Sequence, residues 1–188
     1  FHLARHGWTD IVLLERDELT SGSTWHAAGG MHTINGDPNV AKLQKYTISL
    51  YKEIEELSGQ ATGVHLTGGV LLAATEARLD WLRNKEDGHL DPSGVTHAYA
   101  KAARKLGAEV ERFTKVEDIV RRADGLWRII TNKGEVVAEH VVNAGGLWAR
   151  EVGRMVGLEL PVLAMEHMYL ITEDMPEVAT WNQETGTE

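Results

Sequence analysis

The chain has 188 residues, of which 43% are hydrophobic and 25% are charged, a composition typical of globular proteins. Its net charge of -9 argues against nucleic acid and anionic lipid as partners, and no apolar run is long enough to span a membrane. The absence of cysteine excludes disulfides, thiolate metal sites and cysteine nucleophiles.

The first predicted elements are a short helix over residues 3–5, a glycine stop at Gly7 and a strand over 11–14 that ends in Glu15. This order is typical of the second half of a Rossmann-type dinucleotide-binding unit, in which the acid accepts hydrogen bonds from ribose hydroxyls. An ordinary buried strand followed by a polar loop is the alternative. We expect the first strand and its G-x-G-x-x-G turn to lie before Phe1, because the chain begins inside a helix without a cap.

A small, hydroxyl-rich loop follows this strand over residues 21–30. Such a loop lets backbone N–H groups approach an anionic or flat cofactor, and His26 lies in its middle. His2 and His6 have the helical spacing of a metal pair, but Leu3 stands where the zinc-protease motif needs a glutamate. We therefore interpret these two histidines as part of a solvated helix face and predict no metal site.

Periodic apolar residues predict the elements in the middle of the chain. A helix with one apolar face starts at Asp37 and ends at Gly59, and another covers residues 93–106. A strand is expected over residues 70–74, followed by a helix over 78–85.

A small antiparallel meander is predicted next along the chain. A strand pair element is expected over residues 109–123, and further strands are expected over 126–130 and 136–144. Asp124-Gly125 and Lys133-Gly134 supply the hairpin turns between them.

A second glycine turn follows this meander. Residues 141–144 are expected to form the buried end of a strand, Gly145 and Gly146 the turn, and Trp148 the start of a helix. Backbone N–H groups at such a position favour an anionic group such as a pyrophosphate. The alternative is that any turn from a strand into a helix needs glycine.

Residues 165–172 alternate in a way that predicts a strand, with His167 and Tyr169 on one face. These two side chains could orient a substrate carboxylate or relay a proton. Hydrogen-bonded core residues are the alternative interpretation.

The loops at Leu13–Arg16, Ser21–Gly29 and Asn143–Gly153 resemble those of the dimethylglycine and sarcosine dehydrogenases. These are FAD-dependent amine oxidoreductases of the D-amino-acid-oxidase superfamily. The resemblance implies an α/β fold: a Rossmann-like FAD-binding domain lacking its first strand, with a β-meander and part of a mixed-sheet substrate domain. It assigns residues 1–36 and 86–157 to the FAD-binding domain and residues 37–85 and 158–188 to the substrate domain.

The resemblance also implies roles for individual residues. In the family the loop histidine carries the flavin covalently through its 8α-methyl group, and His26 occupies that position. Val116 is expected to line the adenine through its backbone, and His167 and Tyr169 are the candidate catalytic residues. The candidate cofactor-binding residues are Glu15, Arg16, Gly22, Ser23, Thr24, Trp25, His26, Ala27, Ala28, Gly29, Gly30, Val116, Gly145 and Trp148.

The implied reaction is oxidation of an N-methyl amine or amino acid, such as dimethylglycine or sarcosine, by hydride transfer to flavin N5. The implied electron acceptor is an electron-transfer flavoprotein or oxygen, and folate would act through a domain that this sequence does not contain. We expect a cytoplasmic or mitochondrial-matrix protein, with the cytoplasm favoured.

Two alternatives to this reaction stay open. One is another flavoenzyme of the superfamily, acting on an amino acid or on glycerol phosphate. The other is an inactive fragment that serves as a binding or oligomerisation module. The sequence at the Lys85/Glu86 junction also indicates an internal omission, because the family has several dozen residues of the substrate domain there.

Overall fold

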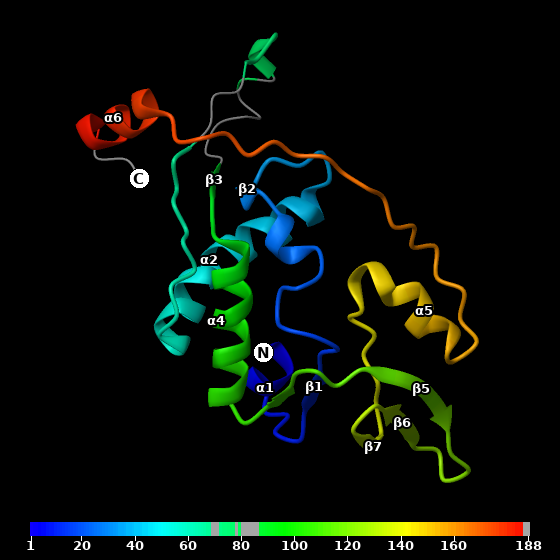
Figure 1. Cartoon of the computed structure of the whole chain (residues 1–188). Coiled ribbons are helices and arrows are strands. Elements are labelled where there is room, and N and C mark those ends of the chain that lie inside the picture. The colour runs from blue at the N-terminus through cyan, green and yellow to red at the C-terminus, as the bar shows by residue number, and fades with distance from the viewer. Residues whose placement is uncertain (69–71, 78, 80–86, 186–188) are drawn as a thin grey trace. The chain divides into compact units, whose positions relative to one another are not determined.

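The computed structural model describes residues 1–68, 72–77, 79 and 87–185 (Figure 1). The chain divides into two compact units. The first unit comprises Phe1–Trp25 and Ala103–His167, and the second comprises His26–Ala102 and Met168–Glu188.

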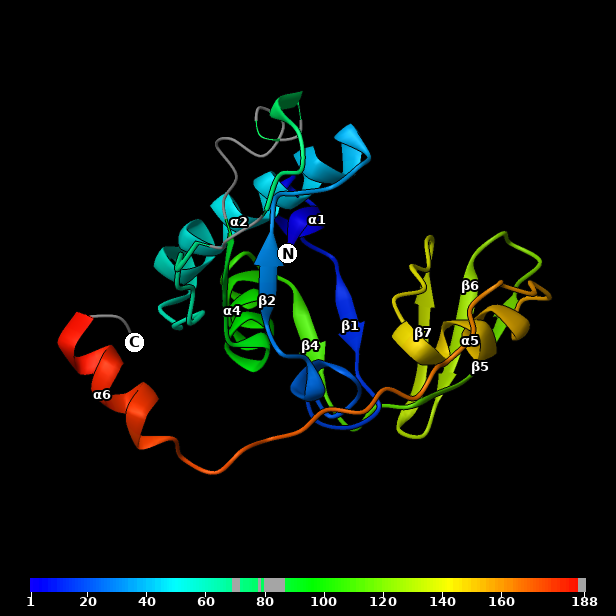
Figure 2. The same cartoon turned by 90° about the horizontal axis from the view of Figure 1, so that it is seen from above.

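A parallel pair of strands lies at the centre of the first unit. Strand β1 (Val12–Leu14) pairs with β4 (Glu109–Glu111), and Figure 2 shows the two running side by side. Helix α1 (His2–Arg5) precedes β1, and the positive φ of Gly7, 93°, lets the chain turn out of the helix. The predicted order of helix, glycine and strand is confirmed, and the pair is parallel as a Rossmann-like sheet requires.

A small apolar core supports this pair. Ala4 of α1 packs with Ala103 and Ala108, which are likewise buried. Phe1, Ile11 and Leu106 cover the cluster from its edges. Small residues here let the helix and the strands approach closely.

The meander is confirmed as a three-stranded antiparallel sheet of β5 (Val116–Arg121), β6 (Trp127–Thr131) and β7 (Gly134–Ala138). The strand pair element predicted over residues 109–123 contains two strands, β4 and β5, but they belong to different sheets. Phe113 lies between them with a φ of 54°, a left-handed conformation that ends an extended strand.

Two further strand predictions are wrong. Residues 141–144 form no strand, and Val142 is 73% exposed instead of buried. Residues 165–172 also form no strand, and Met168 is fully exposed. Alternation of side chains produces a strand only where a neighbouring strand supplies hydrogen bonds, and no described strand pairs with either segment.

After the glycine turn the chain forms the 3-10 turn η2 (Gly146–Trp148) and then helix α5 (Ala149–Arg154). The prediction of a helix beyond the turn is therefore confirmed. Arg150 and Arg154 of α5 both form ion pairs with Glu159, which hold the helix to the segment that follows it.

Helix α2 (Pro38–Ser58) lies in the second unit within one residue of its predicted ends. The Asp37 side chain accepts hydrogen bonds from the N–H groups of Asn39 and Val40, at 2.7 and 3.2 Å, and so caps the first turn. Gly59, with a φ of 67°, ends the helix as predicted. Ile54 of α2 is fully buried.

Among its described residues, the second unit also contains a pair of strands and further helices. Strand β2 (Gly30–His32) pairs antiparallel with β3 (Asp87–His89). Helix α4 (Pro92–Lys105) confirms the helix predicted over residues 93–106, and α6 (Pro176–Thr185) lies near the end of the chain.

The other predictions for the second unit fall largely outside the described residues. This holds for the helix expected over residues 78–85 and for the first part of the strand expected over 70–74; residues 72–74 form no strand. In the part of the chain that the structure describes, no helix is both long and apolar enough to cross a membrane.

Candidate functional site

The backbone of Glu15 joins three segments of the first unit. Its N–H donates to the carbonyl of Glu111 at 2.8 Å, which extends the pairing of β1 and β4 by one residue. Its carbonyl accepts a hydrogen bond from the N–H of Thr114, also at 2.8 Å. Glu15 thus stands at the carboxyl end of a parallel strand, the edge at which sheets of this class bind their ligands.

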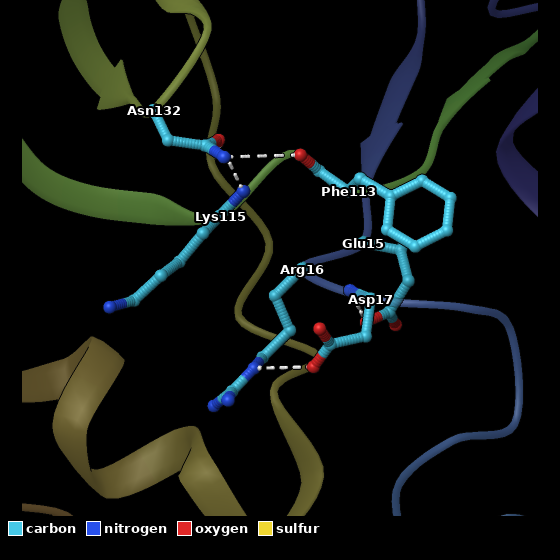
Figure 3. Close-up of polar contacts among 6 residues, drawn as sticks. All are labelled: Glu15, Arg16, Asp17, Phe113, Lys115 and Asn132. Atoms are coloured by element: carbon cyan, nitrogen blue, oxygen red, sulfur yellow. Dashed lines mark hydrogen bonds and ion pairs between the residues drawn. The ribbon is translucent and has the colours of Figure 1, made fainter.

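The Glu15 side chain is half-buried and has one oxygen occupied (Figure 3). Oε1 accepts a hydrogen bond from the N–H of Asp17 at 3.0 Å, which fixes the direction of the side chain. Among the described residues none donates to Oε2, so this oxygen can accept from a ligand. Nε of the neighbouring Arg16 donates a hydrogen bond to the carboxylate of Asp17 at 3.0 Å.

Asn132 organises the segment that leads to Val116, a role that the sequence did not predict. Its Nδ2 donates to the carbonyl of Phe113 at 3.2 Å, and its Oδ1 accepts from the N–H of Lys115 at 2.9 Å (Figure 3). Val116 is half-buried at the start of β5, next to an irregularity in the pairing with β6. The segment that leads to Val116 is therefore held next to Glu15 by the hydrogen bond from the N–H of Thr114.

The hydroxyl-rich loop is anchored at its base and open along its length. Glu18 forms an ion pair with Arg112, and its carbonyl accepts a hydrogen bond from the N–H of Ser21 at 3.2 Å. Within the described part of the chain the N–H groups of Gly22 and Ser23 donate to no acceptor. These donors are available to an anionic or carbonyl-bearing ligand.

Trp148 packs against this loop within the first unit. A Cβ placed on Gly22 would lie 3.1 Å from Cζ3 of Trp148, so the indole and the loop backbone are in contact. On the same indole, the guanidinium carbon of Arg16 lies 4.9 Å from the ring centroid. The structure thus brings Arg16, Gly22 and Trp148, three of the predicted cofactor-binding residues, together.

Asn143 holds the glycine turn that presents Trp148, and the sequence did not single it out. Its Oδ1 accepts from the N–H of Gly145 at 3.1 Å, and its Nδ2 donates to the carbonyl of Ala149 at 2.8 Å. An asparagine placed directly before two small residues and a glycine was the available signal.

In the second unit, His26 and Tyr169 are hydrogen-bonded. His26 ends the 3-10 turn η1 (Thr24–His26), which also contains Trp25, and its Nδ1 lies 2.9 Å from the Tyr169 hydroxyl oxygen. The two rings meet edge to face, with centroids 5.8 Å apart. His167 belongs to the first unit, so the expected pairing of His167 and Tyr169 on one strand face is wrong, because that strand does not form.

The rest of the loop leads into β2. Ala27 and Ala28 are exposed, and Gly30 is the first residue of the strand. Gly29 has a φ of 74°, and a Cβ there would lie 2.0 Å from the carbonyl oxygen of Leu90. Only glycine fits at this position, which fixes where the loop ends.

The sequence model of the FAD-dependent oxidoreductase family (DAO) matches residues 1–86 and 79–187. The chain belongs to this family. Its relatives include mouse dimethylglycine dehydrogenase, a mitochondrial protein, which is 37% identical over 222 residues covering 98% of the chain and 26% of the relative. Human sarcosine dehydrogenase, also mitochondrial, is 32% identical over 92% of the chain and 24% of the relative. The chain thus spans about a quarter of the length of these relatives.

Solved structures of other proteins share the fold. Glycine oxidase from Geobacillus kaustophilus superposes with a TM-score of 0.64 at 24% identity, covering 79% of this chain and 52% of that chain. The α/β, Rossmann-like architecture expected from the sequence is confirmed by this likeness and by the family match.

The family match also bears on the Lys85/Glu86 junction. The two matched segments overlap over residues 79–86, and the alignment with the mouse relative runs over 222 positions against a chain of 188 residues. The relative therefore carries residues within the aligned region that this chain lacks, while the omission expected at Lys85/Glu86 stays a prediction. The junction itself lies outside the described residues.

FAD is the cofactor of this family, and the donors and acceptors of the first unit fit it. Oε2 of Glu15, at the end of β1, is an acceptor of the kind that suits a ribose hydroxyl. Gly22 and Ser23 offer N–H groups beside the Trp148 indole, which suits a group that is both flat and rich in acceptors. Across the described residues, no group of three or more acidic or histidine side chains could hold a metal ion.

Proposed function

We propose that this protein is an FAD-dependent oxidoreductase that oxidises an N-methyl amine or amino acid, such as dimethylglycine or sarcosine. The observation that carries the proposal is the loop over residues 21–30. It contains His26 and follows a parallel strand that ends at Glu15. Support comes from the family match and from relatives named as dimethylglycine and sarcosine dehydrogenases.

The proposed roles of the first unit concern binding. Glu15 accepts hydrogen bonds from the adenosine ribose, while Arg16 and Trp148 support the loop that meets the cofactor. Val116 lines the adenine, and the N–H groups of Gly22 and Ser23 donate to the cofactor. Bound FAD supplies the redox chemistry, since its N5 accepts the hydride that leaves the substrate methyl carbon.

The proposed roles of the second unit concern the reacting end. His26 holds the flavin covalently through the 8α-methyl group, which keeps the ring in place over many turnovers. Tyr169 orients the amine or carboxylate of the substrate, and His167 is the other candidate catalytic residue. The chain keeps the substrate against the ring and excludes water until the iminium product leaves.

The proposed partners follow from the same reaction. Electrons pass to an electron-transfer flavoprotein or to oxygen, and folate takes the one-carbon unit through a domain outside this sequence. We place the protein in the cytoplasm, with the mitochondrial matrix as the alternative, since the named relatives are mitochondrial. Cell fractionation with an antibody to the chain separates these two compartments.

The first experiment is the intact mass of the denatured protein, expressed from its complete gene in cells supplied with riboflavin. We expect a mass increase of one FAD that is absent in His26→Ala. His6→Ala, a change at an exposed histidine that follows α1, is the control and should retain the increase. An unmodified wild-type mass contradicts covalent attachment.

Substrate assays then test the reaction with the same preparation. We expect flavin bleaching by dimethylglycine or sarcosine under anaerobic conditions. Bleaching only by glycine or glycerol 3-phosphate would indicate the other flavoenzyme considered above. A protein without flavin absorbance in excess FAD would instead be an inactive binding or oligomerisation module.

A further inference from the structure

The contact between His26 and Tyr169 joins two residues that are far apart in the sequence. Nδ1 of His26 lies 2.9 Å from the hydroxyl oxygen of Tyr169, and both residues belong to the second unit. The two rings meet edge to face, with 61° between their planes, and the Tyr169 hydroxyl is the group that reaches Nδ1 of the imidazole. One imidazole nitrogen is therefore held by a partner that can either donate or accept.

We propose that Tyr169 is a positioning residue that prepares His26 for covalent attachment of the flavin, an inference that rests on the proposed function. The Tyr169 oxygen accepts a hydrogen bond from Nδ1–H of His26. A neutral imidazole carries one proton, so a proton held on Nδ1 leaves the lone pair on Nε2. Nε2 is then the nitrogen that bonds to the 8α carbon of the flavin.

The same contact provides a route for the proton that must leave. Attachment forms one C–N bond and breaks one C–H bond of the methyl group and the Nδ1–H bond of His26. Two electrons and two protons are released, and dioxygen takes them to give hydrogen peroxide. The Nδ1 proton passes through the Tyr169 hydroxyl to water, which reaches this side chain because it is 55% exposed.

The surroundings of Tyr169 argue against a role in packing. Its neighbours Met168 and Leu170 are 100% and 87% exposed, and the segment has no regular secondary structure. A tyrosine at such a place adds little to a core, whereas its hydroxyl has a defined partner in His26. The role therefore lies in the hydroxyl and is removed by Tyr169→Phe.

The test follows attachment over time in protein expressed from the complete gene in a riboflavin auxotroph and then mixed with FAD. We expect covalent mass to accumulate at least ten-fold more slowly in Tyr169→Phe than in wild type. Tyr46→Phe, a change at an exposed tyrosine of α2, should react like wild type. Equal rates in wild type and Tyr169→Phe would overturn the inference while leaving the proposed function intact.

A second measurement reads the tautomer of His26 without any flavin. Nitrogen-15 spectra of the apoprotein should show Nδ1 protonated in wild type and the proton on Nε2 in Tyr169→Phe, with His26→Ala identifying the signals. This measurement decides the matter if Tyr169→Phe loses FAD binding altogether, and an unchanged tautomer would overturn the inference. A wild-type protein that never gains covalent mass would refute the proposed attachment and this role with it.

Discussion

The indole of Trp148 lies against the backbone of Gly22, so that a Cβ added to this glycine would come within 3.1 Å of Cζ3. Arg16 meets the same ring, with its guanidinium carbon 4.9 Å from the centroid. One side chain thereby connects the end of β1, the hydroxyl-rich loop and the glycine turn. These are the three segments from which the proposed cofactor site is built.

Gly22→Ala should disturb this contact. The added methyl group would lie closer to the indole than an ordinary van der Waals distance. Either the loop or Trp148 must therefore shift by a few tenths of an ångström. We expect a loss of about 1 kcal/mol in the free energy of unfolding and several-fold weaker FAD binding. Urea unfolding followed by tryptophan fluorescence, and flavin titration, measure the two effects.

Gly36→Ala is the matched control for this change, because a Cβ at Gly36 meets no atom within 4 Å. It should bind FAD as wild type does. If Gly22→Ala also bound FAD normally, the packing of Trp148 on the loop would be irrelevant to the cofactor site.

Glu15→Gln should weaken FAD binding by about 10- to 100-fold, since a hydrogen bond to a charged acceptor contributes about 1.5–3 kcal/mol. The measurement belongs in the His26→Ala background, where binding is reversible and a dissociation constant can be obtained by titration. Glu117→Gln, at an exposed position of β5, is the control and should leave the constant unchanged. Equal constants for Glu15→Gln and its control would remove Glu15 from the site.

The sequence predicted the elements whose signals are local. The cap at Asp37, the stop at Gly59 and the glycine at Gly7 act through their own backbone geometry, and all three are confirmed. The acid at the end of β1 is equally local, because an apolar run followed by Glu15 specifies where the strand ends.

The remaining features depend on distant partners, which a single sequence does not display. The segments 141–144 and 165–172 have the composition of strands, yet no described strand pairs with them. Asn132 and Asn143 form side-chain hydrogen bonds to backbone groups. The small residues after Asn143 are a turn signal, but nothing in the sequence shows which backbone groups either asparagine contacts. The bond between His26 and Tyr169 likewise depends on tertiary structure alone.

Thr62→Val should destabilise the second unit. Thr62 is only 1% exposed, and both its N–H and its hydroxyl donate to Oε2 of Glu55, at 2.8 and 2.7 Å. Valine keeps the shape but removes the hydroxyl bond, which should cost about 1–2 kcal/mol in thermal or urea unfolding. Thr67→Val, at an exposed position, should have no measurable effect. A neutral Thr62→Val would mean that the backbone bond alone holds the Glu55 carboxylate.

The ion pairs of Glu159 should make the stability of the first unit depend on pH. Hydrogen bonds from Arg154 and then Arg150 lower the pKa of Glu159 from its ordinary 4.5 to about 2. A carboxyl whose pKa is lower in the folded state stabilises that state above its unfolded pKa, and the benefit is lost as the pH falls from about 4.5 towards 2.

Glu159→Gln should therefore lower the Tm relative to wild type at pH 6, by an amount that shrinks through this window and vanishes near pH 2. Because all three side chains are substantially exposed, the difference at pH 6 should be small and should decrease further in high salt. Glu139→Gln, an exposed carboxylate beyond β7, is the control and should track wild type at every pH. Differential scanning calorimetry between pH 2 and pH 6 makes the comparison, and a Tm difference that is independent of pH would show that Glu159 acts through packing instead of charge.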